Sequence, residues 1–327
     1  MKRHLSLHLL FTSVIAFIFV APVSSSKETA SDSRLSTAAS PLPPGATSVI
    51  STTIFLPLVM QDYPTVFVGA GDIADCASSG HQATANLLDR IAGTVFTLGD
   101  NAYLSGTTSE FATCYHPTWG RHKARTYPAP GNHDYGTLNG AAYYNYFGAV
   151  AGNPATGYYS YDLGDWHMIV INSNCLSVGG CEAGSPQEQW LRSDLAAHPA
   201  LCTLAYWHHP RFSSGSHGDA LEMQPLWQAL YDYNADVVLS GHDHDYERFA
   251  LQDPSGAADS AQGLREFVVG TGGRNHVSFG VIKPNSEIRN NDTFGVLKLM
   301  LYSASYRWEF VPEPGKTFTD TGSTDCH

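Results

Sequence analysis

From Thr65 onward the chain alternates between short apolar runs and polar loops that contain glycine. Apolar runs bounded in this way predict buried strands, and they occupy residues 66–68, 94–98, 201–207 and 236–240. Segments with apolar residues at helical spacing lie between them, at residues 83–91, 185–195 and 226–233. Because strands that alternate with helices build layered α/β structures, the pattern predicts a single α/β domain over residues 65–314.

Three further segments add to this prediction. Residues 157–172 are expected to form two strands joined by a turn at Gly164 and Asp165. Ser185 followed by Pro186 predicts a helix start, since serine caps helices and proline is tolerated in their first turn. Residues 266–270 and 294–311 are strand-rich.

Residues 1–24 have the pattern of a secretion signal, which is cleaved on export. An apolar stretch and then small residues at 21–24 follow the positive head formed by Lys2, Arg3 and His4. A membrane anchor is the alternative. The uninterrupted apolar part from Val14 is, however, too short to cross a bilayer.

Two polar segments flank the predicted domain. Residues 25–64 are rich in Ser, Thr and Pro, a composition that cannot bury a core, and they are predicted to form a flexible linker. Residues 315–327 form a polar tail, expected to be loose unless Cys326 ties it down.

The charge of the chain limits the partners it can have. The 327 residues include 18 Lys and Arg against 30 Asp and Glu, a formal net charge of −12. Such a surface repels nucleic-acid phosphates, so no nucleic-acid partner is expected. An anionic substrate would need a strong local positive charge, which metal ions can supply.

Six cysteines in an apparently exported chain favour disulfides over a thiolate metal site. Cys175 and Cys181 flank a short loop and are easily joined, and Cys76 with Cys114 is the second expected pair. Cys202 lies in an apolar run and is either paired or a buried free thiol.

Five loops that follow predicted strands carry side chains able to bind metal ions. They hold Asp72; Asp100 with Tyr103; Asn132 with His133; His208 with His209; and His242 with His244. Each is a weak signal alone, because an aspartate after glycine is usually a turn residue and a single tyrosine usually packs. Together, oxygen and imidazole donors suit Fe, Mn or Zn and exceed what one tetrahedral ion needs. Two ions sharing a bridging carboxylate would use them all, and such pairs hydrolyse phosphoesters.

The ordered motifs GD, GDNAY, GNHD, HHP and GHDH, spread over about residues 66–311, resemble those of the calcineurin-like metallophosphoesterases. The chain is most similar to the purple acid phosphatases. Many superfamily members carry a histidine in the first loop. The purple acid phosphatases lack it, and this chain has Ala74 at that position. The purple acid phosphatases also carry a tyrosine in the second loop, where this chain has Tyr103. The first loop departs from the family's usual glycine-rich form, and Asp75 adds a carboxylate that either supports the site or is merely exposed.

The resemblance implies a four-layer α/β/β/α sandwich of two mixed β-sheets, in the small secreted form without an added β domain. It implies Fe(3+) plus a divalent metal (Fe, Zn or Mn). The ferric ligands would be Asp72, Tyr103, His244 and a bridging Asp100, and the divalent ligands Asp100, Asn132, His208 and His242.

The resemblance also implies that His133 faces the substrate and that His217 protonates the leaving alcohol. The choice of His208 over His209 as a ligand rests on it too, since alternation along a strand lets only one of them face the site.

We therefore expect a secreted dinuclear-metal acid phosphatase that hydrolyses phosphomonoesters with metal-activated hydroxide. A phosphodiesterase or phospholipid-cleaving enzyme with the same site stays open, and a non-catalytic metal-containing surface binding protein is a remote alternative. The intact His133 and His217 argue against the last of these. The expected partner is a small phosphoester substrate, with no stable membrane insertion after signal cleavage, and the chain is expected to be a monomer.

Overall fold

The computed structural model describes residues 63–327, so the predicted signal peptide and nearly all of the predicted linker lie outside the described residues. The strands are β1 (Thr65–Ala70), β2 (Thr94–Leu98), β3 (Thr126–Ala129), β4 (Tyr159–Leu163), β5 (Trp166–Val170), β6 (Cys202–Tyr206), β7 (Val237–Ser240), β8 (Tyr246–Phe249), β9 (Arg265–Val269), β10 (Ser286–Asn290), β11 (Gly295–Leu301), β12 (Ser305–Pro312) and β13 (Thr321–Asp325). The helices are α1 (Gly80–Leu88), α2 (Thr108–Glu110), α3 (Ala141–Phe147), α4 (Pro186–Ala197) and α5 (Gln224–Asp232). A π-helical turn, Phe111–Tyr115, continues α2, and short 3₁₀ turns connect other elements.

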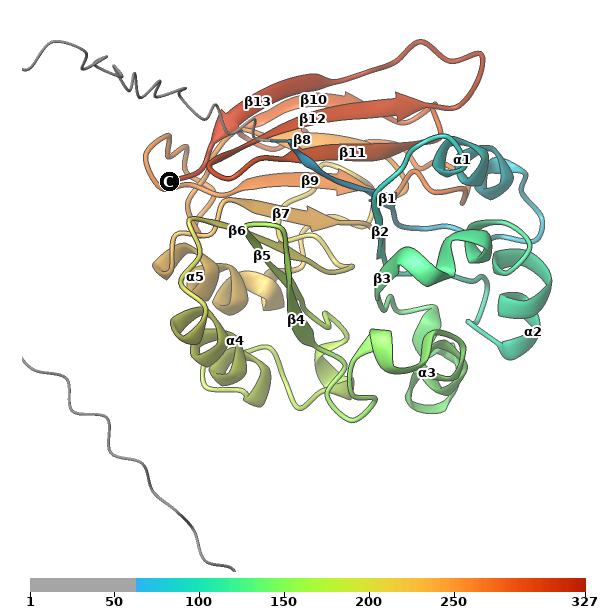
Figure 1. Cartoon of the computed structure of the whole chain (residues 1–327), viewed down its shortest axis with the longest axis horizontal. Helices are drawn as coiled ribbons and strands as arrows, with labels where there is room; N and C mark the ends of the chain where they lie inside the picture. The colour runs from blue at the N-terminus through green and yellow to red at the C-terminus, as the bar shows by residue number, and fades with distance from the viewer. Residues whose placement is uncertain (1–62) are drawn as a thin grey trace, which may run out of the picture. The chain divides into compact units, whose positions relative to one another are not determined.

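The strands form two mixed sheets (Figure 1). The first has the order β13-β12-β11-β1-β2-β3, in which only β1, β2 and β3 run parallel. The second has the order β10-β8-β9-β7-β6-β5-β4, in which β5, β6, β7 and β9 run parallel. Neighbouring parallel strands end at the same edge of their sheet, and that edge collects the loops that follow them.

The two sheets pack face to face, and helices cover their outer faces. Aromatic rings fill the space between the sheets: Phe67 of β1 lies 5.8 Å from Tyr206 of β6 between ring centroids. Along β5 the side chains alternate, so that Met168 faces this inner core while Ile169 faces α4 and α5. The predicted four-layer α/β/β/α sandwich is therefore confirmed.

The expected local signals are present at α4 and at the first strand pair of the second sheet. The Ser185 side chain accepts a hydrogen bond from the backbone N–H of Glu188, and Pro186 occupies the first turn. β4 and β5 form the expected antiparallel hairpin. Within the described part of the chain, no helix is long and apolar enough to cross a membrane.

Three disulfides join the six cysteines. Cys76 is bonded to Cys114 and Cys175 to Cys181, as expected. The open question about Cys202 is answered by a bond to Cys326, so Cys202 is not a free thiol. Cys326 therefore ties down the polar tail, which forms the edge strand β13 against β12.

Candidate metal centre

All seven candidate ligands lie in loops that follow parallel strands of the two sheets. Asp72 follows β1, Asp100 and Tyr103 follow β2, Asn132 follows β3, His208 follows β6, and His242 and His244 follow β7. Because these strands end at the same edge of each sheet and the sheets are stacked, the five loops converge.

The backbone at three of these positions has an uncommon conformation. Asp72, Asp100 and His242 have φ angles of 58°, 51° and 71°, in the left-handed region that non-glycine residues rarely adopt. Such strained positions persist only where surrounding contacts impose them, and they cluster at functional sites. Gly131 allows the close approach of a neighbouring loop, since a Cβ there would lie 2.1 Å from Asp100 Oδ1.

The first group of donor atoms surrounds the Tyr103 hydroxyl. This oxygen lies 2.7 Å from Asp72 Oδ1, 3.0 Å from Asp100 Oδ2 and 3.4 Å from His244 Nε2. The side chain of Tyr103 is buried. Four donors from three loops thus point to one location.

The second group surrounds His208 Nε2. This nitrogen lies 3.1 Å from Asn132 Oδ1, 3.2 Å from His242 Nδ1 and 3.3 Å from Asp100 Oδ2. Asp100 Oδ2 therefore belongs to both groups and is the atom that connects them.

The atoms that face away from the two groups are held by backbone partners. His208 Nδ1 lies 2.7 Å from the carbonyl oxygen of Leu98, and His244 Nδ1 lies 2.8 Å from that of Asn275. Asp72 Oδ2 accepts the N–H of His242, and Asp100 Oδ1 accepts the N–H of His133, both at 2.8 Å. Fixing the far atom of each ligand is how metal sites set the orientation of the near one.

The electrostatics of the cluster fit a bound cation. Burial raises the pKa of Tyr103 well above its ordinary value, and the charges of Asp100 and Asp72 raise it further. Burial also raises the pKa of Asp72. Burial alone would lower the pKa of His208, but Asp100 raises it to about 9. These shifts favour neutral Tyr103 and Asp72, so their anionic forms would need more nearby positive charge than His208 offers. Oxygen and imidazole donors suit hard or borderline metal ions, which could supply that charge.

His133 and His217 lie at the rim of this cluster and are partly exposed. The His133 ring centroid lies 4.5 Å from that of Tyr103, and its Nδ1 lies 2.5 Å from the Leu104 carbonyl oxygen. The His217 ring centroid lies 4.6 Å from that of His242, and its Nδ1 lies 3.0 Å from Asp243 Oδ1. Each ring thus has its Nδ1 fixed, and His133 Nε2 lies 3.8 Å from Asp100 Oδ2, on the side of the donor groups.

The structure adds supporting residues that the motifs did not assign. Asp243 accepts the backbone N–H and faces the ring of His217, although it lies between two ligand candidates in sequence. Asp75 is buried and paired with Arg274, whose guanidinium lies 4.9 Å from the Tyr103 ring centroid. Its position three residues after Asp72 is the only sequence signal for this role.

His209 lies beside the second group, with one ring nitrogen within 4.8 Å of donor atoms of His208 and His242, but it is held by a different partner. Its Nδ1 lies 2.8 Å from Ser173 Oγ, and burial lowers its pKa to about 3. A cavity of about 310 Å³ begins here, beside Asn132, and Leu176 and Glu222 also line it.

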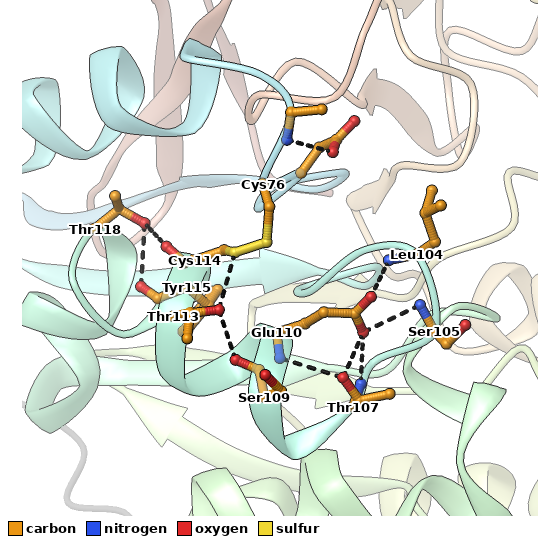
Figure 2. Close-up of a disulfide and its surroundings, with 12 residues drawn as sticks. Cys76, Leu104, Ser105, Thr107, Ser109, Glu110, Thr113, Cys114, Tyr115 and Thr118 are labelled. Atoms are coloured by element: carbon orange, nitrogen blue, oxygen red, sulfur yellow. Dashed lines mark hydrogen bonds between the residues drawn. A yellow bond between two sulfur atoms is a disulfide. The ribbon is translucent and has the colours of Figure 1, made fainter.

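Two of the converging loops are fastened to one helical segment, Thr108–Tyr115 (Figure 2). The disulfide from Cys76 to Cys114 holds the first loop, which carries Asp72. The Glu110 carboxylate accepts the N–H groups of Leu104, Ser105 and Thr107, and so holds the chain that follows Tyr103.

Comparison with known proteins identifies a family model and several curated relatives. Residues 65–246 match the family model described as calcineurin-like phosphoesterase. Purple acid phosphatase 15 of Arabidopsis thaliana is 32% identical over 104 residues, 30% of this chain and 19% of that protein. Purple acid phosphatase 23 of the same plant is 27% identical over 232 residues, 59% of this chain and 50% of that protein. The chain thus spans about a fifth to a half of the length of these curated relatives.

Solved structures resemble the chain in fold. A purple acid phosphatase from yellow lupin seeds, PPD1, has a TM-score of 0.65 and 19% identity, covering 81% of this chain and 54% of its own. GAP50, an anchor in the inner membrane complex of Plasmodium, has a TM-score of 0.62 and 15% identity, covering 81% of this chain and 90% of its own. At such identities the likeness shows the fold alone.

Proposed function

Because the chain belongs to the calcineurin-like phosphoesterase family, we propose that it is an acid phosphatase of the purple acid phosphatase type, which hydrolyses phosphomonoesters at a dinuclear metal centre. The observation that carries this proposal is the pair of donor groups joined by one oxygen, Asp100 Oδ2. A lone carboxylate shared by two sets of ligands is the arrangement that two neighbouring ions require.

Asp72, Tyr103, His244 and Asp100 would hold Fe(3+), and Asp100, Asn132, His208 and His242 would hold a divalent Fe, Zn or Mn ion. Tyrosine oxygen suits a hard trivalent ion, and the imidazole-rich second group suits a borderline divalent one. Such ions withdraw charge from a phosphoryl oxygen and make a water molecule nucleophilic at ordinary pH.

His217 and His133 would bind the phosphoester at the rim. Asp243 fixes Nδ1 of His217, so its Nε2–H can donate a proton to the leaving alcohol oxygen. The Leu104 carbonyl fixes Nδ1 of His133, which leaves Nε2 to contact a phosphoryl oxygen. Alanine at His217 should lower kcat for esters with poor leaving groups by roughly 10²-fold or more.

The experiment that tests the proposal combines metal analysis and a visible spectrum with hydrolysis of para-nitrophenyl phosphate by the purified mature protein. We expect about two metals per chain including iron, a broad visible band, and turnover. Tyr103→Phe should lose the band, and Asp100→Ala should lose turnover. Two colourless metals with turnover would refute the iron–tyrosinate assignment, and an unchanged rate in Asp100→Ala would refute the catalytic site.

The same assay with bis-para-nitrophenyl phosphate separates the monoesterase from a phosphodiesterase with the same ligands. A higher kcat/KM on the diester would replace the phosphomonoesterase assignment. Absence of both metal and turnover would instead favour a binding protein.

We also propose that the enzyme is exported. The three disulfides of the described domain support this, since such bonds persist in oxidising compartments. Recovery of the uncleaved chain inside the cell, with none in the medium or envelope fraction, would refute export.

A further inference from the structure

A second cluster of metal-binding side chains lies at the opposite edge of the second sheet. His167 is near the start of β5, whereas the candidate ligands follow the ends of β6 and β7, which run parallel to β5 through their shared sheet. Asp194 lies in the last turn of α4 and His198 follows its end.

The donor atoms of this cluster are close enough to share one ion. His167 Nε2 lies 2.8 Å from Asp194 Oδ2, and His198 Nδ1 lies 3.4 Å from Asp194 Oδ1. One donor atom from each of the three residues lies within 4.8 Å of the others. Donors bound at ~2.0–2.1 Å around a tetrahedral zinc ion are roughly 3.3 Å apart. The His198 ring now stacks on the His167 ring, with centroids 4.8 Å apart, and its Nδ1 lies 2.9 Å from the Asp194 carbonyl oxygen, so binding requires that this half-exposed ring rotate toward the ion.

The remaining atoms of the two buried members are already held in place. Asp162 Oδ1 lies 3.0 Å from His167 Nδ1, a contact that fixes the ring and directs Nε2 toward Asp194. Ser160 Oγ donates to Asp194 Oδ1 at 2.8 Å. A carboxylate behind a histidine ligand and a hydrogen bond to a ligating carboxylate are the usual outer partners of a metal site.

The third member and the space beside it give access. The His198 side chain is 48% exposed, and its four-residue spacing from Asp194 places both on one side of the helix end. A cavity of about 300 Å³ adjoins His167 and His198, and Asp162 and Asp165 add negative charge to its wall. A water molecule from this cavity can complete a tetrahedral set.

We propose that His167, Asp194 and His198 bind one divalent transition-metal ion of the zinc class, separate from the proposed dinuclear centre. The ion would connect the β4–β5 hairpin to the end of α4. The alternative is that His167 only donates hydrogen bonds to Asp162 and Asp194, with no ion.

Equilibrium dialysis of the full mature protein against Zn²⁺ distinguishes a metal site at His167, Asp194 and His198 from a cluster held by hydrogen bonds alone. His198→Ala should bind one zinc ion fewer than wild type, while His116→Ala, at another exposed histidine, should bind as many as wild type. Asp162→Asn should bind the same number with roughly 10- to 100-fold weaker affinity at this site. Equal stoichiometry in wild type and His198→Ala would overturn the proposal.

The same substitution in a second protein, His242→Ala, shows whether the lost zinc ion belongs to this site or to the proposed active site. In a His242→Ala protein, which alters the proposed dinuclear centre, adding His198→Ala should still remove one zinc ion. Phosphatase activity should be unaffected by His198→Ala alone, which also shows that this variant folds. If the difference of one ion disappears in the His242→Ala background, the zinc belongs to the proposed active site and the second site is refuted.

Discussion

Tyr103 lies between carboxylates on one side and a guanidinium on the other. Its hydroxyl oxygen faces Asp72 and Asp100, while Arg274 lies over its ring and is held there by Asp75. A cation over the ring stabilises a phenolate electrostatically. Arg274 is thus placed to influence the electronic properties of Tyr103 in its proposed role as an iron ligand.

Arg274→Gln should therefore move the visible band of the iron-loaded protein to longer wavelength. Removal of the cation raises the energy of the phenolate electrons, which lowers the energy of charge transfer to iron. A cation–π contribution of about 1 kcal/mol corresponds to a shift on the order of 10 nm. Arg289→Gln is the matched control, because Arg289 contacts Ser286 and not Tyr103. A band shifted equally in both variants, or in neither, would contradict this role.

At the residue scale, the sequence predicted the candidate ligands but not the residues that hold them in position. The seven donors sit in short motifs that can be read directly. The Asp75–Arg274 pair joins residues 199 positions apart, and no local pattern encodes such a contact. The preference for His208 over His209 was available only from resemblance. In the structure His208 Nε2 lies beside Asp100 and His209 Nδ1 lies beside Ser173, and the preference for His208 stays a prediction.

At the scale of elements, the short segment Thr108–Tyr115 positions two ligand loops at once. Glu110 completes a capping box with Thr107 and also accepts the N–H groups of Leu104 and Ser105. Its carboxylate therefore links the start of a helix to the residues that directly follow Tyr103.

Glu110→Ala should destabilise the fold by about 1–2 kcal/mol, the usual effect of losing a helix cap and its partners. It should also lower iron occupancy, since Tyr103 loses the support of its loop. Denaturant unfolding and metal analysis measure the two effects. Thr113→Ala is the control, because the Thr113 hydroxyl contacts only its own helical segment. Full iron occupancy in Glu110→Ala would show that the loop needs no such support.

Glu266 of β9 plays a similar part for the loop that follows His208. Its buried carboxyl accepts the N–H groups of Arg211 and Phe212. Burial raises its pKa to about 8 from 4.5. The native state therefore keeps a proton that the unfolded chain releases, so the stability from this group is full below about pH 4.5 and is lost as pH rises to about 8.

The free energy of unfolding should consequently fall between pH 5 and pH 8 by on the order of a few kcal/mol from this group. Glu266→Gln should lose that part of the dependence, because its amide does not titrate. Denaturant midpoints of both proteins over pH 5–9 isolate the contribution as their difference. Parallel curves for the two proteins would show that Glu266 titrates normally.

Elements were predictable where they carry an apolar pattern. β6, β7 and α5 hold buried residues at strand or helix spacing and were predicted within a few residues of their ends. β13 has the sequence TGSTD, with no large apolar residue, and it is a strand because its backbone pairs with β12. Such an edge strand depends on a partner far along the chain, so its own sequence did not reveal it.

In the domain as a whole, the two ends of the parallel strands of the second sheet carry different features. The loops after β6 and β7 carry the candidate active site, whereas the beginning of β6 carries Cys202 and its bond to Cys326. This bond closes a segment of 124 residues and attaches the last strand of the first sheet to the second sheet. Cys175 and Cys181 close only six residues, beside the cavity near His209.

The double substitution Cys202→Ser and Cys326→Ser should therefore cost much more stability than Cys175→Ser and Cys181→Ser. Closing a loop restricts the unfolded chain, and the restriction grows with loop length, to roughly 5 kcal/mol for the long loop against roughly 2 kcal/mol for the short one. Guanidinium unfolding of the oxidised proteins measures both. At 25 °C the folded Cys202→Ser/Cys326→Ser protein should keep its hydrolytic rate, because the bond lies at the sheet edge away from the proposed active site. The short-loop variant should alter KM, because Cys175 lines the cavity beside the candidate ligand Asn132. Equal losses of stability in the two variants would mean that strain or packing, and not the length of chain that each bond closes, determines what the disulfides contribute.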